Sequence, residues 1–246
     1  MVASSPRIAF WLERGDLAAC EIAAILGYEL VVVDMEHGAI GADVLDRIVA
    51  HCRASGLACY VRVAGADRVP IQQALDFGAD GVMVPQIEDA EHAARVSGFA
   101  KYPPLGTRGI GFSRTMGYGW VQDGFFDDEN RRAACHLMIE TPGALRDVEA
   151  IAALDTVDGL FIGPSDLSMT RGRGAYSFSD GDVEDFRTVA AAARAAGKRL
   201  GLPAPSAGAY DLAVAEGADY VTISDDLSAL SDGLSQALNV VRSERR

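Results

Sequence analysis

The sequence predicts a single (β/α)8 barrel that occupies residues 1–246 as one domain. The chain has 246 residues, close to the roughly 250 of such barrels. Eight short apolar runs alternate with eight helical patterns, which favours a parallel sheet. Two similar turns, FGAD at 77–80 and EGAD at 216–219, indicate a repeated helix-to-strand unit. A doubly wound sheet is the main alternative, but no G-x-G-x-x-G turn follows an early strand.

The expected strands are apolar at most positions, as parallel strands covered on both faces should be. In a barrel their carboxyl ends converge on one pocket, so the residues that follow them are the first candidates for a site. The expected bounds are Ile8–Leu12, Leu30–Asp34, Ala58–Val63, Gly81–Val84, Leu137–Glu140, Gly159–Ile162, Arg199–Leu202 and Tyr220–Ile223.

Each expected helix lies between two strands or closes the chain. Several of the helical patterns are followed by a glycine, which is typical of a helix C-terminus; these are Gly27, Gly56, Gly78, Gly197 and Gly217. The expected bounds are Leu17–Leu26, Ala42–Ser55, Pro70–Phe77, Asp89–Phe99, Leu145–Leu154, Val183–Ala196 and Ala207–Glu216, with a last helix near 230–243.

Two segments interrupt this rhythm, near 101–135 and at 169–181. The first has six glycines, two adjacent prolines and several aromatic residues, with no clear strand–helix unit. Long irregular segments inside compact domains are usually functional loops. We therefore expect an active-site loop near 101–135, and we place both segments at the end of the barrel where sites form.

Composition excludes several classes of protein. The net charge of −13 and the pI near 4.7 argue against binding to nucleic acid, because an acidic body repels phosphates. The apolar runs are too short to span a bilayer, and the four cysteines form no C-x-x-C pair. These features predict a soluble, cytoplasmic protein with reduced thiols and without a membrane or nucleic-acid partner. Only Lys101 and Lys198 are lysines, and neither is placed for Schiff-base chemistry.

Two carboxylates follow neighbouring expected strands, Glu140 after the fifth and Asp166 after the sixth. Two oxygen ligands with open positions suit Mg²⁺ or Mn²⁺. Each residue alone has an ordinary structural explanation as an acid at the start of a helix. Together, and flanked by Gly143 and Gly163, they favour a divalent-metal site.

A histidine and an arginine also lie near the carboxyl ends of expected strands. His37, beside Asp34 and Glu36, is the best candidate for acid–base catalysis, because its ordinary pKa lies near 6.5. A hydrogen-bonded loop histidine is the alternative. Arg62 lies on an apolar strand, where an arginine has to be paired or has to meet an anion. In the segment near 101–135, Arg108 and Arg114 could meet an anionic substrate or simply be solvated.

Several motifs in this order resemble the HpcH/HpaI aldolase family, from about residue 8 to 230. They are DMEHG at 34–38, the strand with Arg62, YPP at 102–104 with RGIG at 108–111, MIET at 138–141 and GPSDLS at 163–168. The resemblance implies a (β/α)8 barrel, a divalent metal (Mg²⁺, Mn²⁺ or Co²⁺) and a homohexamer built as a trimer of dimers. It also implies reversible aldol chemistry through a pyruvate enolate.

The resemblance also implies roles for individual residues. Glu140 and Asp166 match the metal carboxylates, and Arg62 matches the arginine that stabilises the enolate oxygen. His37 matches the residue that handles the proton. Asp76 matches the acid that pairs with this histidine, which could belong to an adjacent subunit.

The backbone amides near Gly163 and Ser165 match those that receive the pyruvate carboxylate, which agrees with anion binding at a helix start. Two positions depart from the family pattern. Met138 stands where glutamine is usual, and Ser165 where alanine is common. Since methionine cannot donate an amide hydrogen bond, these departures bear on the identity of the substrate.

The resulting hypothesis is a metal-dependent aldolase that cleaves a 4-hydroxy-2-oxo acid reversibly to pyruvate and an aldehyde. One alternative is a lyase of the citrate-lyase β type, which acts on a coenzyme A thioester and needs cations to hold the nucleotide. The other is a catalytically silent barrel that serves in binding or assembly. Against the silent barrel, His37, Arg62, Glu140 and Asp166 all fall at one predicted barrel mouth.

Overall fold

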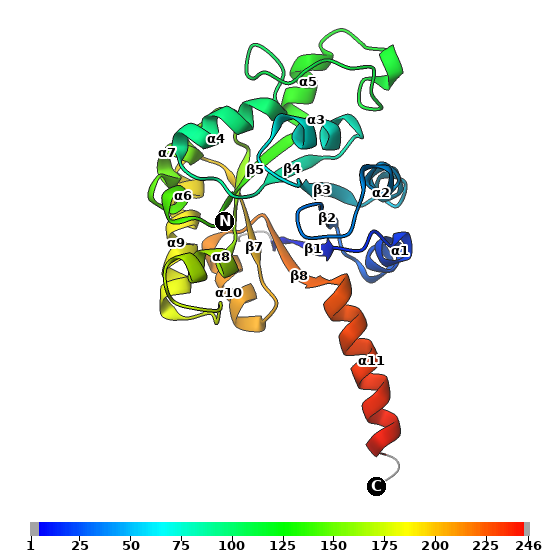
Figure 1. Ribbon diagram of the computed structural model, residues 1–246, viewed down its shortest axis with the longest axis vertical. Coiled ribbons are helices and arrows are strands. Elements are labelled where there is room, and N and C mark those ends of the chain that lie inside the picture. The colour runs from blue at the N-terminus through cyan, green and yellow to red at the C-terminus, as the bar shows by residue number, and fades with distance from the viewer. Residues whose placement is uncertain (1–4, 244–246) are drawn as a thin grey trace.

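The computed structural model describes residues 5–243 and contains a closed barrel of eight parallel strands. The strands pair in chain order, and the first also pairs with the last (Figure 1). The predicted fold is confirmed. The strands are β1 (Arg7–Leu12), β2 (Leu30–Asp34), β3 (Ala58–Arg62), β4 (Gly81–Val84), β5 (Ala134–Ile139), β6 (Gly159–Ile162), β7 (Arg199–Pro203) and β8 (Tyr220–Asp225).

The helices surround the barrel, apart from the last one, which extends away from it (Figure 1). Predicted and observed bounds are identical for α1 and α10. The helices are α1 (Leu17–Leu26), α2 (Ala42–Ala54), α3 (Arg68–Asp76), α4 (Ala90–Ser97), α5 (Phe125–Arg132), α6 (Pro142–Arg146), α7 (Val148–Ala152), α8 (Pro164–Thr170), α9 (Asp180–Ala195), α10 (Ala207–Glu216) and α11 (Asp226–Ser243). Short 3₁₀ turns occupy Gly98–Ala100 and Gly117–Gly119.

Alternation along the strands produces two apolar layers. One set of side chains packs between the strands and the helices, and a smaller set fills the barrel interior. Tyr60, Phe161 and Tyr220 are the large members of the interior set. A Cβ at Gly201 would overlap the ring of Tyr220, so glycine is required there. The interior is a packed core, as in other barrels of this kind, and it forms the floor beneath the strand carboxyl ends.

Several elements differ from the sequence-based expectation. The predicted helix 145–154 is two short helices, α6 and α7, separated at Asp147. Strand β5 begins at Ala134 instead of Leu137. Helices α5 and α8 lie within segments that showed no apolar period. Tertiary context stabilises these short helices, since isolated helices of seven or eight residues are marginal in water.

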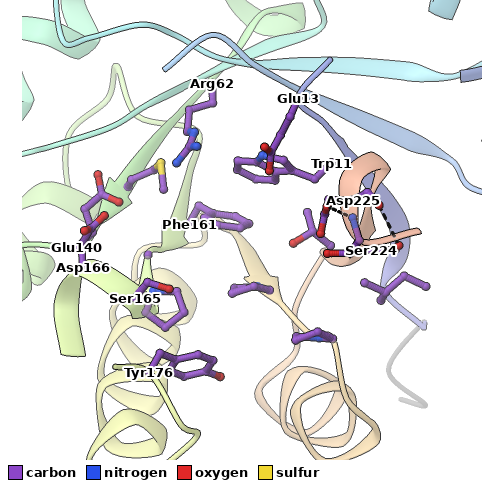
Figure 2. A pocket seen from close by; sticks show the side chains of 18 of the residues that line it. Trp11, Glu13, Arg62, Glu140, Phe161, Ser165, Asp166, Tyr176, Ser224 and Asp225 are labelled. Carbon is purple, nitrogen blue, oxygen red and sulfur yellow. Dashed lines mark hydrogen bonds between the residues drawn. The ribbon is translucent and has the colours of Figure 1, made fainter. Parts of the chain in front are cut away.

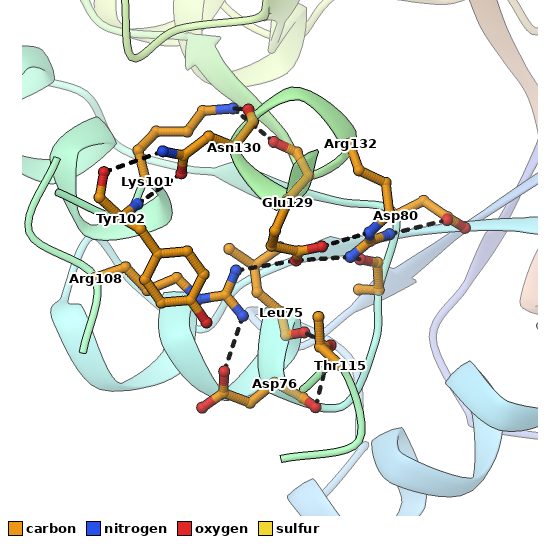
Figure 3. A network of polar contacts seen from close by, with 12 residues as sticks. Leu75, Asp76, Asp80, Lys101, Tyr102, Arg108, Thr115, Glu129, Asn130 and Arg132 are labelled. Atoms are coloured by element: carbon orange, nitrogen blue, oxygen red, sulfur yellow. Dashed lines mark hydrogen bonds and ion pairs between the residues drawn. The ribbon is translucent and has the colours of Figure 1, made fainter. Parts of the chain in front are cut away.

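The segment near 101–135 does not lie at the end of the barrel where the sequence analysis placed it, and a role in the active site stays a prediction that concerns a second copy of the chain. It connects α4 to β5, so it lies at the amino ends of the strands, opposite the end where the strand carboxyl termini meet. Its side chains form a buried network (Figure 3). Arg108 donates to Glu129 at 3.1 Å and to Asp76 at 2.8 Å, and Arg114 pairs with Asp46 at 2.8 Å. These arginines hold the segment in place.

Helix α11 has no buried side chain and carries a row of exposed leucines and valines. Leu230, Leu234 and Leu238 recur every four residues and are 61%, 64% and 49% exposed. Ile25 on α1 is also exposed, at 84%. Within residues 5–243, no helix is long and apolar enough to cross a membrane. All four cysteines are free and buried.

Candidate active site

A cavity of about 500 Å³ lies at the carboxyl ends of the strands (Figure 2). Its walls include residues from or directly after β1, β3, β5, β6, β7 and β8. Four of the residues predicted from the sequence line it together with Gly163: Arg62, Glu140, Ser165 and Asp166. His37 and Asp76 are not among its lining residues. Met138 lies on its floor, inside the barrel core.

Arg62 is fixed by two carboxylates of β2 and the turn after it. Its Nε donates to Asp34 Oδ1 at 3.0 Å, its Nη2 contacts Asp34 Oδ2, and its Nη1 lies 3.2 Å from Glu36 Oε2. Burial opposes ionisation of Asp34, but the hydrogen bonds and the charge of Arg62 outweigh burial and hold its pKa below the ordinary value. Trp11 donates to Asp34 at 3.2 Å, and its ring lies 4.9 Å from the guanidinium carbon. The arginine is therefore charged and held in one orientation.

Glu140 is a buried carboxylate at the end of β5. Its Oε1 accepts a 2.6 Å hydrogen bond from the backbone N–H of Gln86, which has a left-handed backbone (φ 55°). A Cβ at Gly163 would overlap Glu140 Oε2, so only glycine permits this approach. Burial raises the pKa of Glu140 to about 7; Glu36 and Asp166 raise it further, while the Gln86 hydrogen bond and Arg62 oppose the shift. A buried carboxylate with acidic neighbours is the kind of group that a cation stabilises.

Asp166 lies in the first turn of α8, beside Glu140 (Figure 2). It is exposed to the cavity, whereas Glu140 is 1% exposed. Oxygen donors are the ligands of Mg²⁺ and Mn²⁺, and two carboxylates leave positions for water and substrate. The donor chemistry therefore fits a divalent metal held by two protein ligands. No group of three or more histidine, cysteine or acidic side chains within residues 5–243 has metal-site geometry.

Gly163 and Ser165 lie where β6 passes into α8. Gly163 is the residue before the helix, and Pro164 begins it. Proline is favoured at this position because its missing N–H is not needed there. The first turn of α8 thus faces the same cavity as Glu140 and Arg62, with Ser165 on the wall. This location is compatible with the predicted contact between backbone amides and a carboxylate.

His37 lies in the turn after β2, with its side chain 66% exposed. Its backbone N–H donates to Asp34 Oδ1 at 3.1 Å, and its Nε2 lies 3.9 Å from Glu36 Oε2. The turn is tight, because a Cβ at Gly38 would overlap the Asp34 carbonyl oxygen. Asp34 therefore positions both His37, through its backbone, and Arg62, through its side chain. The imidazole itself lies outside the cavity wall of this chain.

Asp76 lies at the opposite end of the barrel from His37. It is the last residue of α3, and its Oδ1 accepts the hydrogen bond from Arg108 in the network of Figure 3. A helix that follows a strand runs back along the barrel, which carries its end to the amino side of the strands. A contact between His37 and Asp76 therefore does not form within one chain. Their predicted pairing stays a prediction that concerns two copies.

The structure adds lining residues that the sequence reasoning missed. Trp11 and Phe161 form an aromatic part of the wall with ring centroids 5.9 Å apart. Glu13 follows β1 and Asp225 ends β8, so a survey of all eight strand ends would have found them. Tyr176 comes from the second irregular segment, which follows β6 and α8 as expected.

The two lysines lie outside the cavity. Lys101 Nζ donates to the carbonyl oxygens of Asn130 and Ala133 at 2.8 and 2.7 Å. Lys198 Nζ donates to those of Leu154 and Val157 at 3.0 and 2.7 Å. Neither amine lines the cavity of this chain.

Comparison with known proteins identifies the family. The model of the HpcH/HpaI aldolase/citrate lyase family matches residues 7–231. The chain is 32% identical over 240 residues to a hydroxypyruvate/pyruvate aldolase of Rhizorhabdus wittichii, covering 95% of this chain and 93% of that protein. It is 40% identical over 177 residues to a 4-hydroxy-2-oxovalerate aldolase of Novosphingobium aromaticivorans. That match covers 70% of this chain and 66% of the relative, just under two thirds of its length.

Solved structures agree with this result. A crystal structure of an HpcH/HpaI aldolase/citrate lyase family protein from Burkholderia cenocepacia superimposes with a TM-score of 0.88 at 29% identity. The superposition covers 97% of this chain and 95% of that one. A citrate synthase superimposes equally well at 23% identity, which shows a shared fold. The chain belongs to the HpcH/HpaI aldolase/citrate lyase family.

Proposed function

We propose that this protein is a divalent-metal-dependent aldolase that reversibly cleaves a 4-hydroxy-2-oxo acid to pyruvate and an aldehyde. Membership of the family and the names of the relatives support aldol chemistry. The observation that carries the proposal is a single cavity in which Arg62, held by two carboxylates, lines one wall with Glu140 and Asp166. This arrangement offers cationic charge and a metal site to one small oxo acid.

Glu140 and Asp166 are the residues that would hold Mg²⁺, Mn²⁺ or Co²⁺. When bound, the metal would polarise the 2-oxo group of the substrate as a Lewis acid. Glu140 is anchored by the Gln86 N–H and backed by Gly163, so one of its oxygens is oriented by the protein before any ligand arrives. Ser165 and the first turn of α8 would receive the substrate carboxylate.

Arg62 supplies charge where the reaction develops it. Removal of the proton from the C4 hydroxyl allows the C3–C4 bond to break, releasing the aldehyde and moving the bonding electrons to C3 and the C2 oxygen. The enolate oxygen then carries negative charge next to the guanidinium. Preorganised charge of this kind lowers the barrier, because no reorientation is needed during the reaction. Protonation at C3 gives pyruvate.

His37 is the group proposed to take the C4 hydroxyl proton. Its imidazole lies beyond the cavity wall of its own chain, and Asp76 lies at the far end of the barrel. The proposal therefore places the pair between two copies, with Asp76 of one copy orienting His37 of another. Histidine is the residue that most often serves as a general base in enzymes.

A homohexamer, arranged as a trimer of dimers, is part of the same proposal. The exposed leucines of α11 and the exposed apolar face of α1 support this assembly. Contiguous apolar patches on a protein surface mark sites at which another surface binds and removes them from water. A second copy is the occupant we propose for the α11 face. Assembly would also bring Asp76 to another copy's barrel mouth.

The alternative function, a lyase that acts on a coenzyme A thioester, has less support from the cavity. Arg62 is the one basic residue among the cavity's lining residues within 5–243, and it is already engaged by Asp34 and Glu36. A nucleotide with several phosphates needs further cations. A catalytically silent barrel would not need Arg62 and Glu140. Burying these two charged groups costs free energy, and without a function nothing would offset that cost.

The test is pyruvate release from a panel of 4-hydroxy-2-oxo acids, measured with a lactate dehydrogenase couple. We expect activity without coenzyme A, its loss after chelation, and its return with Mg²⁺, Mn²⁺ or Co²⁺. Full activity of protein shown by elemental analysis to be metal-free would contradict the metal site. Borohydride with pyruvate should leave Lys101 and Lys198 unmodified, since neither lines the cavity; a stable mass increase on either would overturn the enolate mechanism.

A further inference from the structure

The wall opposite the proposed metal carboxylates is also acidic. Glu13 and Asp225 line the cavity across from Glu140 and Asp166 (Figure 2). They come from neighbouring strands of the closed barrel, because Trp11 of β1 pairs in register with Asp225 of β8. Glu13 follows β1 by one residue. The two carboxylates therefore belong to the same part of the rim.

Backbone hydrogen bonds hold both residues in place. Asp226 accepts from the N–H groups of Glu13 and Arg14 at 3.0 and 2.9 Å, which fixes the turn after β1. Asp225 Oδ1 accepts from the Ser228 N–H at 2.7 Å at the start of α11. Arg62, the one basic residue among the described residues that line the cavity, forms its ion pairs with Asp34 and Glu36 and not with Glu13 or Asp225. Burial raises the pKa of Glu13, and Asp225, Asp34 and Asp226 raise it further.

The cavity has room for a second reactant beside these residues. Its volume of about 500 Å³ is within the range of small-ligand pockets and extends past the end occupied by Arg62, Glu140 and Asp166. Trp11 and Phe161 separate the two ends (Figure 2). Around Glu13 and Asp225 the wall adds the hydroxyl-bearing residues Thr222, Ser224 and Ser228. This end is rich in hydrogen-bond acceptors and has no cation.

We propose that Glu13 and Asp225 form the aldehyde subsite and select neutral, hydroxyl-bearing aldehydes over aldehydes that carry a carboxylate. This inference rests on the proposed aldolase function. Carboxylates accept hydrogen bonds from hydroxyl groups and have no donor to offer in return. An anionic aldehyde would meet two like charges in a partly buried site, where charge repulsion is stronger than in water. Specificity then comes as much from repulsion as from attraction.

Two matched aldehyde pairs test this subsite in the synthetic direction, with pyruvate as the partner. Succinic semialdehyde and its methyl ester differ in one charge, and glyceraldehyde and propanal differ in hydroxyl groups. We expect the wild-type kcat/KM to favour the ester over the acid and glyceraldehyde over propanal. Glu13→Gln and Asp225→Asn should each raise the acid-to-ester ratio roughly tenfold and lower the glyceraldehyde-to-propanal ratio.

Asp211→Asn is the matched control, because Asp211 is an exposed residue of α10 outside the cavity and the change in charge is the same. It should leave both ratios at the wild-type values. The Gln and Asn substitutions keep side-chain size, and thermal melting confirms that the variants are folded.

The inference is overturned if the wild type uses succinic semialdehyde as well as its ester. It is also overturned if folded Glu13→Gln and Asp225→Asn variants keep both wild-type ratios. Exchange of the pyruvate α-protons with deuterated water separates these results from failure of the function. Wild type that neither exchanges nor condenses with any aldehyde overturns the proposed function and the subsite together, whereas exchange with the wrong aldehyde preference overturns the subsite alone.

Discussion

At the scale of single residues, Asp34 organises the site more than any other side chain. Its carboxylate binds the Arg62 guanidinium, the Trp11 indole N–H and the backbone N–H groups of Glu36 and His37. A charged group accepting this many donors is rigid, because several hydrogen bonds would have to break before it moved. Asp34 therefore fixes the position of Arg62 and takes no part in the proposed reaction itself.

Arg62→Lys should reduce both aldol cleavage and pyruvate α-proton exchange by about 10²-fold. A lysine ammonium keeps the charge but cannot bind both Asp34 oxygens in the geometry of a guanidinium. Arg68→Lys, on α3 outside the cavity, should leave both rates unchanged. Nuclear magnetic resonance follows the exchange and the coupled assay follows cleavage. Wild-type exchange in a folded Arg62→Lys variant would show that Arg62 does not stabilise the enolate.

His37→Ala should separate the two rates. Cleavage needs removal of the C4 hydroxyl proton and should fall by about 10²-fold or more. Exchange of the pyruvate α-protons needs the enolate without a C4 hydroxyl, so it should fall less. His51→Ala on α2 provides the control for loss of an imidazole elsewhere. Normal cleavage by the His37→Ala protein would place the base on another group near Asp34 or Glu36.

At the scale of elements, each connection contributes to this chain's cavity only if it lies at the carboxyl ends of the strands. The segment that connects α4 to β5 lies at the amino ends of the strands, although its composition is typical of a functional loop. The short connection from β6 through α8 brings Asp166, Ser165 and Tyr176 to the cavity. Helix α11 carries an apolar face that has no partner within the described chain.

Leu234→Glu combined with Leu238→Glu should dissociate the assembly. Two charges placed in an apolar interface lose hydration without gaining partners, so association weakens by several kcal/mol. Light scattering after gel filtration measures the mass. Gln236→Glu adds one charge to the same helix, away from the row of leucines, and should keep the wild-type mass. If the double variant has the wild-type mass, α11 does not bind the second copy.

At the scale of the whole molecule, the barrel interior contributes a pH dependence of stability. His136 is fully buried against Tyr60 and Tyr220, and its Nδ1 lies 3.2 Å from the Tyr220 hydroxyl. Burial lowers its pKa to about 3, with further lowering from Arg199 and Lys101. Between pH 3 and 6.5 the unfolded chain binds a proton that the folded chain does not, so stability rises with pH in this range.

His136→Leu should flatten this dependence. The wild type should lose roughly 2 kcal/mol more of its free energy of unfolding between pH 7.5 and 5 than the variant does, as expected for one histidine of ordinary unfolded pKa. Urea denaturation at the two pH values measures the difference. His51→Gln removes a histidine that is not fully buried and should retain the wild-type dependence. Parallel pH profiles for wild type and His136→Leu would show that another group causes the acid sensitivity.

The sequence by itself determined the barrel, its strands to within a few residues, and the four lining residues Arg62, Glu140, Ser165 and Asp166. These follow from local signals, since apolar runs and glycine stops mark strands, and a parallel barrel gathers every residue that follows a strand. The short helices α5 and α8 and the split at Asp147 lacked such a signal.

Only the tertiary structure decided where the remaining candidates lie. Asp76 and the segment near 101–135 are at the amino end of the barrel, because direction along the barrel depends on which element precedes each loop. Glu13 and Asp225 are far apart in sequence and become neighbours only because β1 pairs with β8 when the sheet closes. Closure is a property of the whole chain, so no local pattern at either residue encodes their proximity.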